Sequence, residues 1–214
     1  EAQNHSHRRT PLGGSRPPDE PGPTAAGLQE PPALPRVRIG LIRHFPVTEP
    51  WPRGWVTSAD LQRWRVRYDA AAPIVGPIDV SAVAWQRCFS SDLPRAYITA
   101  QKAFSGTITP TPLLREADVP ALPTGKLKLP VWGWRMLLRL LWFTGHKSQR
   151  AARDAFLARI KTIADLLEQG PTDTLVVSHA GVMFFLRGEL LRRGFTGLKF
   201  GLAEHARLYV FERA

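Results

Sequence analysis

The chain has 214 residues and a formal net charge of +11, and 43% of its residues are hydrophobic. This length and composition are typical of one globular domain with a sizeable core. The single cysteine, Cys88, excludes an internal disulfide and a cysteine-based zinc site, whereas the positive charge favours anionic partners such as phosphate esters, nucleic acid or an acidic membrane surface.

Residues 1–36 are rich in proline, glycine and serine and show almost no aliphatic periodicity. Basic and acidic side chains balance there, so the whole charge excess lies on residues 37–214. Such a segment buries too little apolar surface to offset its ordering entropy, and we expect a disordered Pro/Gly-rich leader. The first residue is Glu1 rather than Met, as in a processed or trimmed product, and no signal-type apolar run is visible. We therefore expect a cytoplasmic protein, with a membrane-peripheral location as the alternative.

The stretch Val37–His44 is an apolar run that ends abruptly in a cation and an imidazole, Arg43 and His44. Pro46 follows and cannot continue a central strand. In an open α/β sheet, ligands bind just beyond the carboxyl ends of the strands. The sequence therefore predicts a strand at Val37–Ile42 that delivers a candidate anion site containing a nucleophile.

Residues 58–114 predict two helices and two strands, because apolar positions at helical spacing alternate with short strand-type runs. The expected elements are a helix capped by Ser58 and running through Tyr68, a strand at Ala82–Trp85 continuing toward Phe89, a helix capped by Ser91 or Asp92 and reaching Phe104, and a strand between Ile108 and Leu114.

Residues 119–153 carry seven basic side chains and no acidic one, and about 119–147 form a hydrophobic basic insert. Within it, Trp132–Phe143 predicts a helix that is apolar almost all round, with Arg135 and Arg139 one turn apart on a narrow polar stripe. The run is too short to span a bilayer. Three roles remain open: a buried helix, a hydrophobic lid over the site, or an interfacial anchor with Trp and Arg at the level of the lipid headgroups.

The C-terminal third predicts helices and strands in alternation. They are a helix from Ser148 or Gln149 to Gly170, a strand at Thr174–Ser178 ending in His179, a helix from Val182 to about Arg193, and a strand at Arg207–Glu212. Alternating strands and helices favour a single three-layer α/β domain over residues 37–214, with a mainly parallel sheet and helices on both faces.

Three predicted strand or loop ends carry the candidate site residues, namely Arg43-His44, Arg95 and His179. A doubly wound sheet brings such ends to one edge. The guanidinium groups offer fixed forks of donors that suit the oxygens of a phosphoryl group, and the imidazoles add a nucleophile and a second donor.

Four motifs then occur in a recognisable order: Leu41-Ile42-Arg43-His44, the run from Ser90 to Ala100, Leu114-Arg115-Glu116, and Val176-Val177-Ser178-His179-Ala180-Gly181. Together they resemble those of the histidine phosphatase superfamily, also called phosphoglycerate-mutase-like, over about residues 37–213. The resemblance implies the phosphoglycerate-mutase-like fold.

The resemblance also implies site roles. His44 looks like the nucleophile that becomes phosphohistidine, and Arg43, Arg95 and His179 look like the phosphate pocket. Glu116 looks like the general acid and later the base, with Asp118 two residues away. No metal or cofactor is expected. The chain departs from the family in having Phe45 where glycine is common, and Val119–Pro123 where a segment with glycine and tryptophan is common.

The expected function is that of a metal-independent phosphomonoester hydrolase, a histidine acid-type phosphatase acting on a phosphorylated small molecule or a phosphoprotein. The alternatives are a phosphoglycerate-mutase-like phosphotransferase, a phosphohistidine-protein phosphatase and a non-catalytic phosphate-binding module. The basic, Trp-rich insert suggests one of two things: a hydrophobic or amphipathic phosphate substrate, or transient contact with an acidic membrane. Nucleic acid is not an expected partner, because no nucleic-acid motif accompanies the basic residues. His205 receives no role.

Overall fold

The computed structural model describes residues 36–213, so the leader predicted at residues 1–36 lies outside the described residues except for Arg36. Within the described part, a six-stranded sheet has the order β4-β3-β6-β1-β8-β7. Four neighbouring strands are parallel, and β8 and β7 add an antiparallel edge. The strands are β1 (Val37–Arg43), β3 (Arg87–Ser91), β4 (Ile108–Thr111), β6 (Thr174–Ser178), β7 (Thr196–Gly197) and β8 (Leu208–Arg213).

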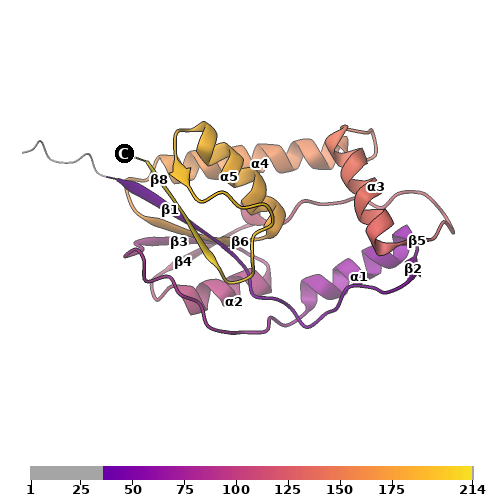
Figure 1. Cartoon of the computed structure of the whole chain (residues 1–214), viewed down its shortest axis with the longest axis horizontal. Helices are drawn as coiled ribbons and strands as arrows, with labels where there is room; N and C mark the ends of the chain where they lie inside the picture. Colours follow the sequence, from indigo (N-terminus) through magenta and orange to yellow (C-terminus); the bar gives the residue numbers. More distant parts are fainter. Residues whose placement is uncertain (1–35, 214) are drawn as a thin grey trace, which may run out of the picture. The chain divides into compact units, whose positions relative to one another are not determined.

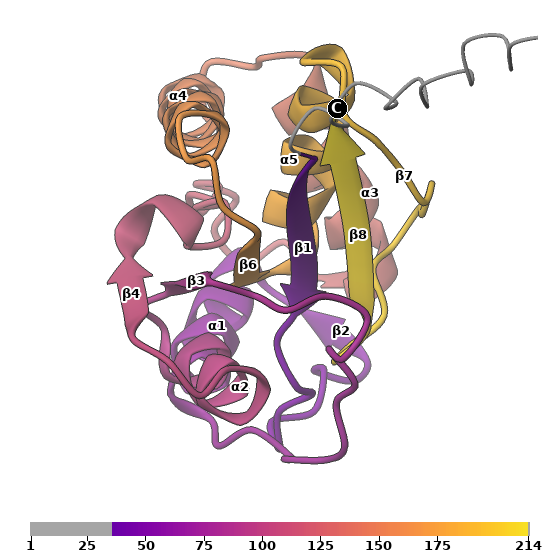
Figure 2. The same cartoon turned by 90° about the vertical axis from the view of Figure 1, so that its left-hand side faces the viewer.

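Helices cover both faces of this sheet, as Figures 1 and 2 show. Helices α4 and α5 pack on one face, where Ile39 and Leu41 of β1 contribute to their core. Helix α2 packs on the other face against Ile42, and α1 lies on the same side. The helices are α1 (Ser58–Ala70), α2 (Pro94–Ala103), α3 (Val131–Phe143), α4 (Arg150–Glu168) and α5 (Ala180–Arg192).

This arrangement follows from the alternation of side chains along a strand. In β6, Val176 points into the α4–α5 core, whereas Leu175 and Val177 point into the α2 core. A strand buried on both faces reads as a continuous apolar run, which is the pattern of parallel sheets. The predicted fold class, a three-layer α/β domain with a mainly parallel sheet, is confirmed.

The strand predicted at Ala82–Trp85 is wrong, because β3 begins only at Arg87. Trp85 instead lies over β1, where a Cβ on Gly40 would collide with its indole ring. The indole nitrogen donates to the carbonyl of Val80, 2.9 Å away, and this bond closes the turn that precedes β3. The apolar residues before β3 therefore cover the sheet and do not join it.

The predicted helix caps are also wrong. Thr57 caps α1 in a reciprocal capping box with Asp60, and the hydroxyl of Ser58 accepts from the backbone N–H of Leu122, 2.9 Å away. Leu93 precedes α2 with no side-chain cap. Ser91 and Asp92, the predicted caps, contact His179 and Arg115, and these contacts are described with the site.

The strand predicted between Ile108 and Leu114 is β4, which ends at Thr111, where Pro112 opens a short 3₁₀ turn. The last strand is shifted by one residue to Leu208–Arg213. A second, two-stranded sheet was not predicted: β2 (Trp55–Val56) pairs with β5 (Leu129–Pro130) just before α3.

Helix α3 is anchored by one side only. Trp134 is fully buried and donates its indole N–H to the carbonyl of Val56, 2.7 Å away, and Trp142 packs against Phe156. The opposite side, with Trp132, is exposed. A wholly buried helix, one of the three expected roles, is therefore excluded. None of the helices in the described part is both long and apolar enough to cross a membrane.

Candidate active site

The carboxyl ends of β1 and β6 bring His44 and His179 together. Residue Arg43 is paired with Ser178 in the parallel ladder, and the backbone N–H of His44 continues the pairing by donating to the carbonyl of Ser178 at 2.9 Å. The two imidazole centroids are 5.0 Å apart. Arg95, at the start of α2, places its Nε 3.3 Å from Nε2 of His44. The residues predicted from three strand ends thus meet at one edge of the sheet.

His44 is almost completely buried, with 2% of its surface exposed. Its Nδ1 lies 2.5 Å from the carbonyl oxygen of Phe45. Because a carbonyl only accepts, Nδ1 carries the ring proton, and the lone pair on Nε2 accepts from Nε of Arg95. Burial, opposed by the bond to Phe45 and reinforced by the charge of Arg95, lowers the pKa of His44 to about 3. The ring is therefore a neutral base at neutral pH.

The loop that carries His44 is fixed by α2. The backbone N–H of Phe45 donates to Oγ1 of Thr99 at 2.9 Å, and that hydroxyl donates in turn to the carbonyl of Arg95 at 2.7 Å. The Phe45 side chain is buried. The bulky residue at the family's glycine position thus forms part of the interior, while its carbonyl orients His44.

His205, for which no role was predicted, lies beside His44. Its Nδ1 donates to the carbonyl of His44 at 2.6 Å, and its ring meets the His44 ring edge-on with centroids 5.2 Å apart. Burial lowers its pKa. Ala206, next to it, has a positive φ of 56° and donates its N–H to the carbonyl of Arg43. This loop supports the segment that carries His44 from the side of β8.

The two predicted arginines converge on the same space. Arg95 is buried, with its guanidinium over the Tyr68 ring at 5.0 Å. Its Nη1 lies 2.9 Å from a carboxylate oxygen of Asp69, but off the hydrogen-bond direction. Arg43 donates from Nη1 to the carbonyl of Ala203 at 2.9 Å, while its buried Nε has no partner among the described residues. Burial lowers the pKa of Arg43. Both groups therefore retain donors that can bind an anion.

His179 is fully buried, and burial, together with the nearby His44 and Arg95, lowers its pKa well below the usual value. Its Nε2 lies 2.9 Å from Oγ of Ser91. Its Nδ1 is buried and has no partner in the described part of the chain, which is a cost unless a ligand satisfies it. Ser91, expected as a helix cap, thus positions this imidazole.

Glu116 follows the 3₁₀ turn after β4 and reaches the N-terminus of α5. One carboxylate oxygen accepts from the N–H of Gly181 at 3.1 Å, and the other accepts from the N–H of Ala117 at 3.0 Å. A Cβ on Gly181 would collide with this carboxylate. The Glu116 charge is also near enough to Arg43 to oppose the fall in the pKa of that arginine. The predicted acid therefore lies at the same edge of the sheet.

Asp118 and Asp92 lie outside this inner cluster. The side chain of Asp118 is 82% exposed and lies 3.7 Å from Arg65. Asp92, expected as a helix cap, instead accepts from Nε of Arg115 at 2.7 Å.

A cavity of about 440 Å³ opens beside the cluster. Its wall includes Glu116 and Asp69, so it reaches both the predicted acid and the partner of Arg95. Its three arginines offset its three carboxylates, so the wall is polar and has no net charge. The lining residues are Arg65, Asp69, Leu93, Pro112, Arg115, Glu116, Asp118 and Arg159.

Solved structures with a related fold have low sequence identity to this chain. One described as mycobacterial hydrolase 2 is 17% identical with a TM-score of 0.50, covering 83% of this chain and 82% of that one. Mycobacterial glucosyl-3-phosphoglycerate phosphatase is 20% identical, with a TM-score of 0.45 and coverage of 73% and 80%. Phosphoglycerate mutase from Thermus thermophilus is 24% identical, with a TM-score of 0.44 and coverage of 79% and 90%.

Sequence comparison is more specific about the family. No curated protein matches the chain significantly. Residues 78–214, well over half of the sequence, match the family model of the histidine phosphatase superfamily (branch 1). The match includes Arg95, Glu116 and His179 but begins after β1. Arg43 and His44 lie outside it and are placed at the site by the pairing of β1 with β6. The chain therefore belongs to the histidine phosphatase superfamily.

Proposed function

We propose that this chain is a phosphomonoester hydrolase that acts, without a metal ion, through a phosphohistidine on His44. The observation that carries the proposal is the state of that imidazole. Its ring proton is held on Nδ1 by the carbonyl of Phe45, and its Nε2 faces Arg95 in a buried, positively charged site. A neutral ring with a directed lone pair is what nucleophilic attack on phosphorus requires.

The phosphoryl group would bind between Arg43, Arg95 and His179. The arginine forks match phosphate oxygens, and they stabilise the charge that spreads over those oxygens in the transition state. The unpaired Nε of Arg43 is a buried donor, and the unpaired Nδ1 of His179 is another when Nε2 of that ring accepts from the hydroxyl of Ser91. Such donors need no reorganisation when the ligand arrives.

In the first step, Nε2 of His44 forms a bond to phosphorus while the bond from phosphorus to the ester oxygen breaks. Glu116, protonated at that moment, gives its proton to the leaving oxygen and the alcohol departs. In the second step, Glu116 as a carboxylate takes a proton from water, whose oxygen attacks phosphorus. The bond from nitrogen to phosphorus breaks, inorganic phosphate leaves, and His44 and Glu116 return to their starting states.

The same intermediate serves a mutase, so the fate of the phosphoryl group distinguishes the two reactions. A hydrolase releases inorganic phosphate with water as the only acceptor. A mutase requires a phosphorylated second substrate and releases little phosphate in its absence. The substrate class proposed here is a phosphate monoester, because three donor groups converge on one phosphoryl position.

The test is hydrolysis of 4-nitrophenyl phosphate with a chelator present, comparing wild type with His44→Asn, Glu116→Gln and His146→Asn. His146 is an exposed histidine in the loop after α3 and serves as the matched control. We expect His146→Asn to match wild type, His44→Asn to show no turnover, and Glu116→Gln to lose about 10²-fold in kcat.

A second measurement addresses the intermediate. Quenching turnover in an alkaline denaturant should trap the wild type with phosphate attached to histidine, a linkage that alkali spares and acid cleaves. The His44→Asn variant should carry no such phosphate. Turnover that persists in His44→Asn, or a folded wild type that binds phosphate and releases none from any ester, would remove the proposal.

A further inference from the structure

The exposed side of α3 is an apolar face that the fold does not use. Four large side chains, spaced at four, four and three residues, lie along it: Trp132, Met136, Leu140 and Phe143, each between 60% and 71% exposed. This spacing places them on one side of a helix, along about 16 Å of its length. We call these four residues the α3 apolar face. The helix is already held by Trp134 and Trp142 on its other side, so the exposed residues are free for a partner.

More exposed aromatic side chains lie at the start of this helix. Trp55 is 67% exposed and is paired with Pro130, the residue directly before α3. Trp51, half-exposed, stacks on Trp64 and also lies under the guanidinium of Arg135, 5.2 Å from the ring centre. Leu127, on the chain leading into β5, is also exposed. The apolar surface therefore extends from α3 across the β2–β5 pair.

Cations flank this surface without acidic partners. Arg135 and Arg139 alternate with the apolar residues of α3, and Lys126 and Lys128 precede it, all of them exposed. Within residues 36–213, none of these four forms an ion pair with a carboxylate. The acidic residues of the neighbouring segment are neutralised locally, since Glu49 pairs with Arg67 at 2.9 Å and Asp60 pairs with Arg63 at 2.5 Å.

We propose that the α3 apolar face and its flanking cations form a docking surface for a bilayer that contains anionic lipids. An interfacial helix combines an apolar side with Trp, Arg and Lys at headgroup depth, and its binding strength depends on both apolar burial and attraction to anionic lipids. The uncompensated charge argues against a second copy of the chain as the occupant. A two-fold interface would bring the same four cations of each copy together.

The surface also lies on the side of the molecule that holds the candidate site. In Figure 1, α3 and the β2–β5 pair lie beyond the sheet on the side to which the carboxyl ends of β1 and β6 point. Docking through α3 therefore keeps the site edge of the sheet on the membrane side. The binding proposal does not depend on the proposed reaction, because its readout is association with lipid.

The experiment is co-sedimentation of the full chain with vesicles of phosphatidylcholine alone and with vesicles that also contain phosphatidylglycerol. Wild type should sediment with the anionic vesicles only, and added salt should weaken that binding. Arg135→Gln/Arg139→Gln should lower the partition coefficient about 30-fold, at about 1 kcal/mol for each cation near the surface. Trp132→Ser/Met136→Ser/Leu140→Ser should abolish binding.

The matched control is Leu198→Ser/Lys199→Gln/Leu202→Ser, which removes exposed apolar and basic side chains from the loop between β7 and β8. It should bind as wild type does, and circular dichroism should give the same fold for every variant. Three outcomes would overturn the proposal. Wild type stays in the supernatant with both vesicles; the α3 variants bind as well as wild type; or ultracentrifugation finds a dimer that the triple serine variant dissociates.

Discussion

Gly181 is a residue whose missing side chain makes room for another group. It stands in the first turn of α5, and the carboxylate of Glu116 occupies the space that a Cβ would fill while accepting its N–H. We predict that Gly181→Ala pushes this carboxylate away and lowers the hydrolysis of phenyl phosphate about 10²-fold. The loss should be smaller for 2,4-dinitrophenyl phosphate, whose leaving oxygen needs no proton. Steady-state kinetics with the two esters measures the difference.

Gly188 in the same helix is the control, because nothing lies within 4 Å of a Cβ built there. Gly188→Ala should keep wild-type activity and stabilise the fold by up to about 1 kcal/mol, since alanine favours the helix. Equal losses with both esters in Gly181→Ala would show that the substitution damages the site generally rather than the acid.

The sequence predicts the site residues that follow the ends of strands. It does not predict those that reach the site from a helix or from a distant loop. Arg43, His44 and His179 could be predicted because a strand end fixes their position. Asp69 lies in the last turn of α1 and His205 in the loop before β8, and no local pattern tells that these meet Arg95 and His44. In the sequence these two residues are only a carboxylate and an imidazole. Their role can be assigned only when the fold shows which side chains they contact.

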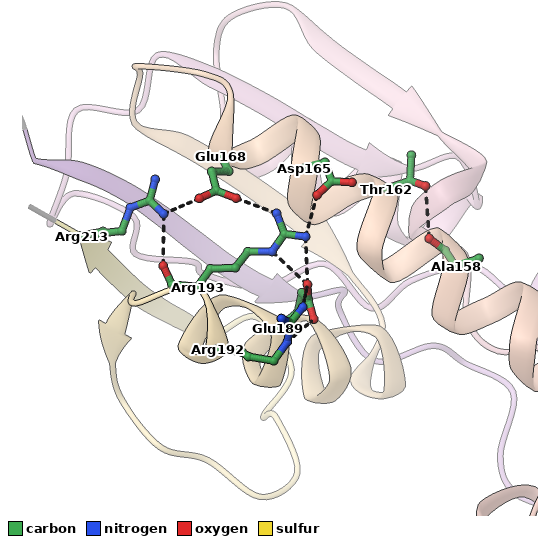
Figure 3. A network of polar contacts seen from close by, with 8 residues as sticks. All are labelled: Ala158, Thr162, Asp165, Glu168, Glu189, Arg192, Arg193 and Arg213. Carbon is green, nitrogen blue, oxygen red and sulfur yellow. Dashed lines mark hydrogen bonds and ion pairs between the residues drawn. The ribbon is translucent and has the colours of Figure 1, made fainter.

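Among the elements, α4, α5 and β8 are joined at one end by an ion-pair cluster (Figure 3). Arg193, just after α5, contacts Asp165 at 2.6 Å and Glu168 at 2.7 Å on α4, and Glu189 at 2.9 Å on α5. Only 14% of its side chain is exposed. We predict that Arg193→Ala lowers the free energy of unfolding by about 2 kcal/mol, between the values for exposed and buried pairs. Urea denaturation measures it.

Arg63→Ala is the matched variant, because Arg63 pairs with a single carboxylate, Asp60, and its side chain is 66% exposed. It should change the free energy of unfolding by less than about 1 kcal/mol. If both variants lower the free energy of unfolding equally, the cluster around Arg193 stabilises the fold no more than a surface ion pair does. Packing of α4 on α5 would then be what joins these elements.

The boundaries of helices and strands could be predicted where one hydrophobic periodicity dominates. The predictions were wrong where the tertiary packing of a single side chain determines the local structure. The apolar run of β6 and the helical spacing of α4 predicted their positions to within a residue or two. Trp85 looked like part of a strand, yet it packs over Gly40 of β1, which β6 separates from β3, and no local pattern predicts that contact. Helix α3 looked apolar all round, and only tertiary packing determines that Trp134 is buried and Trp132 is exposed.

For the whole molecule, the layer order followed from the alternation of strands and helices, since parallel strands require crossovers that cover both faces. The two-stranded β2–β5 sheet did not follow. Its strands are two residues long and lie more than 70 positions apart, between Trp55 and Pro130. Turn residues such as Pro123 and Gly125 occur in the insert, but they do not specify a pairing partner that far away in the sequence.

The buried imidazoles also determine how the whole molecule responds to acid. His44 has a pKa of about 3 in the folded chain, and the pKa values of His179 and His205 are also lowered, all chiefly by burial. In the unfolded chain these rings titrate near the ordinary value of about 6.5. Below that pH the unfolded state therefore binds more protons than the folded state, and the free energy of unfolding falls as the pH falls.

For His44 alone, the expected loss between about pH 7.5 and about pH 5 is about 2 kcal/mol. Urea denaturation at the two pH values, in buffers without phosphate, measures the total loss. His44→Asn should show a loss smaller by about that amount, because one buried base is gone, whereas His146→Asn should follow wild type. A wild-type free energy of unfolding that is unchanged at the lower pH would mean that these imidazoles titrate alike in the folded and unfolded chains, and it would contradict the lowered pKa of His44.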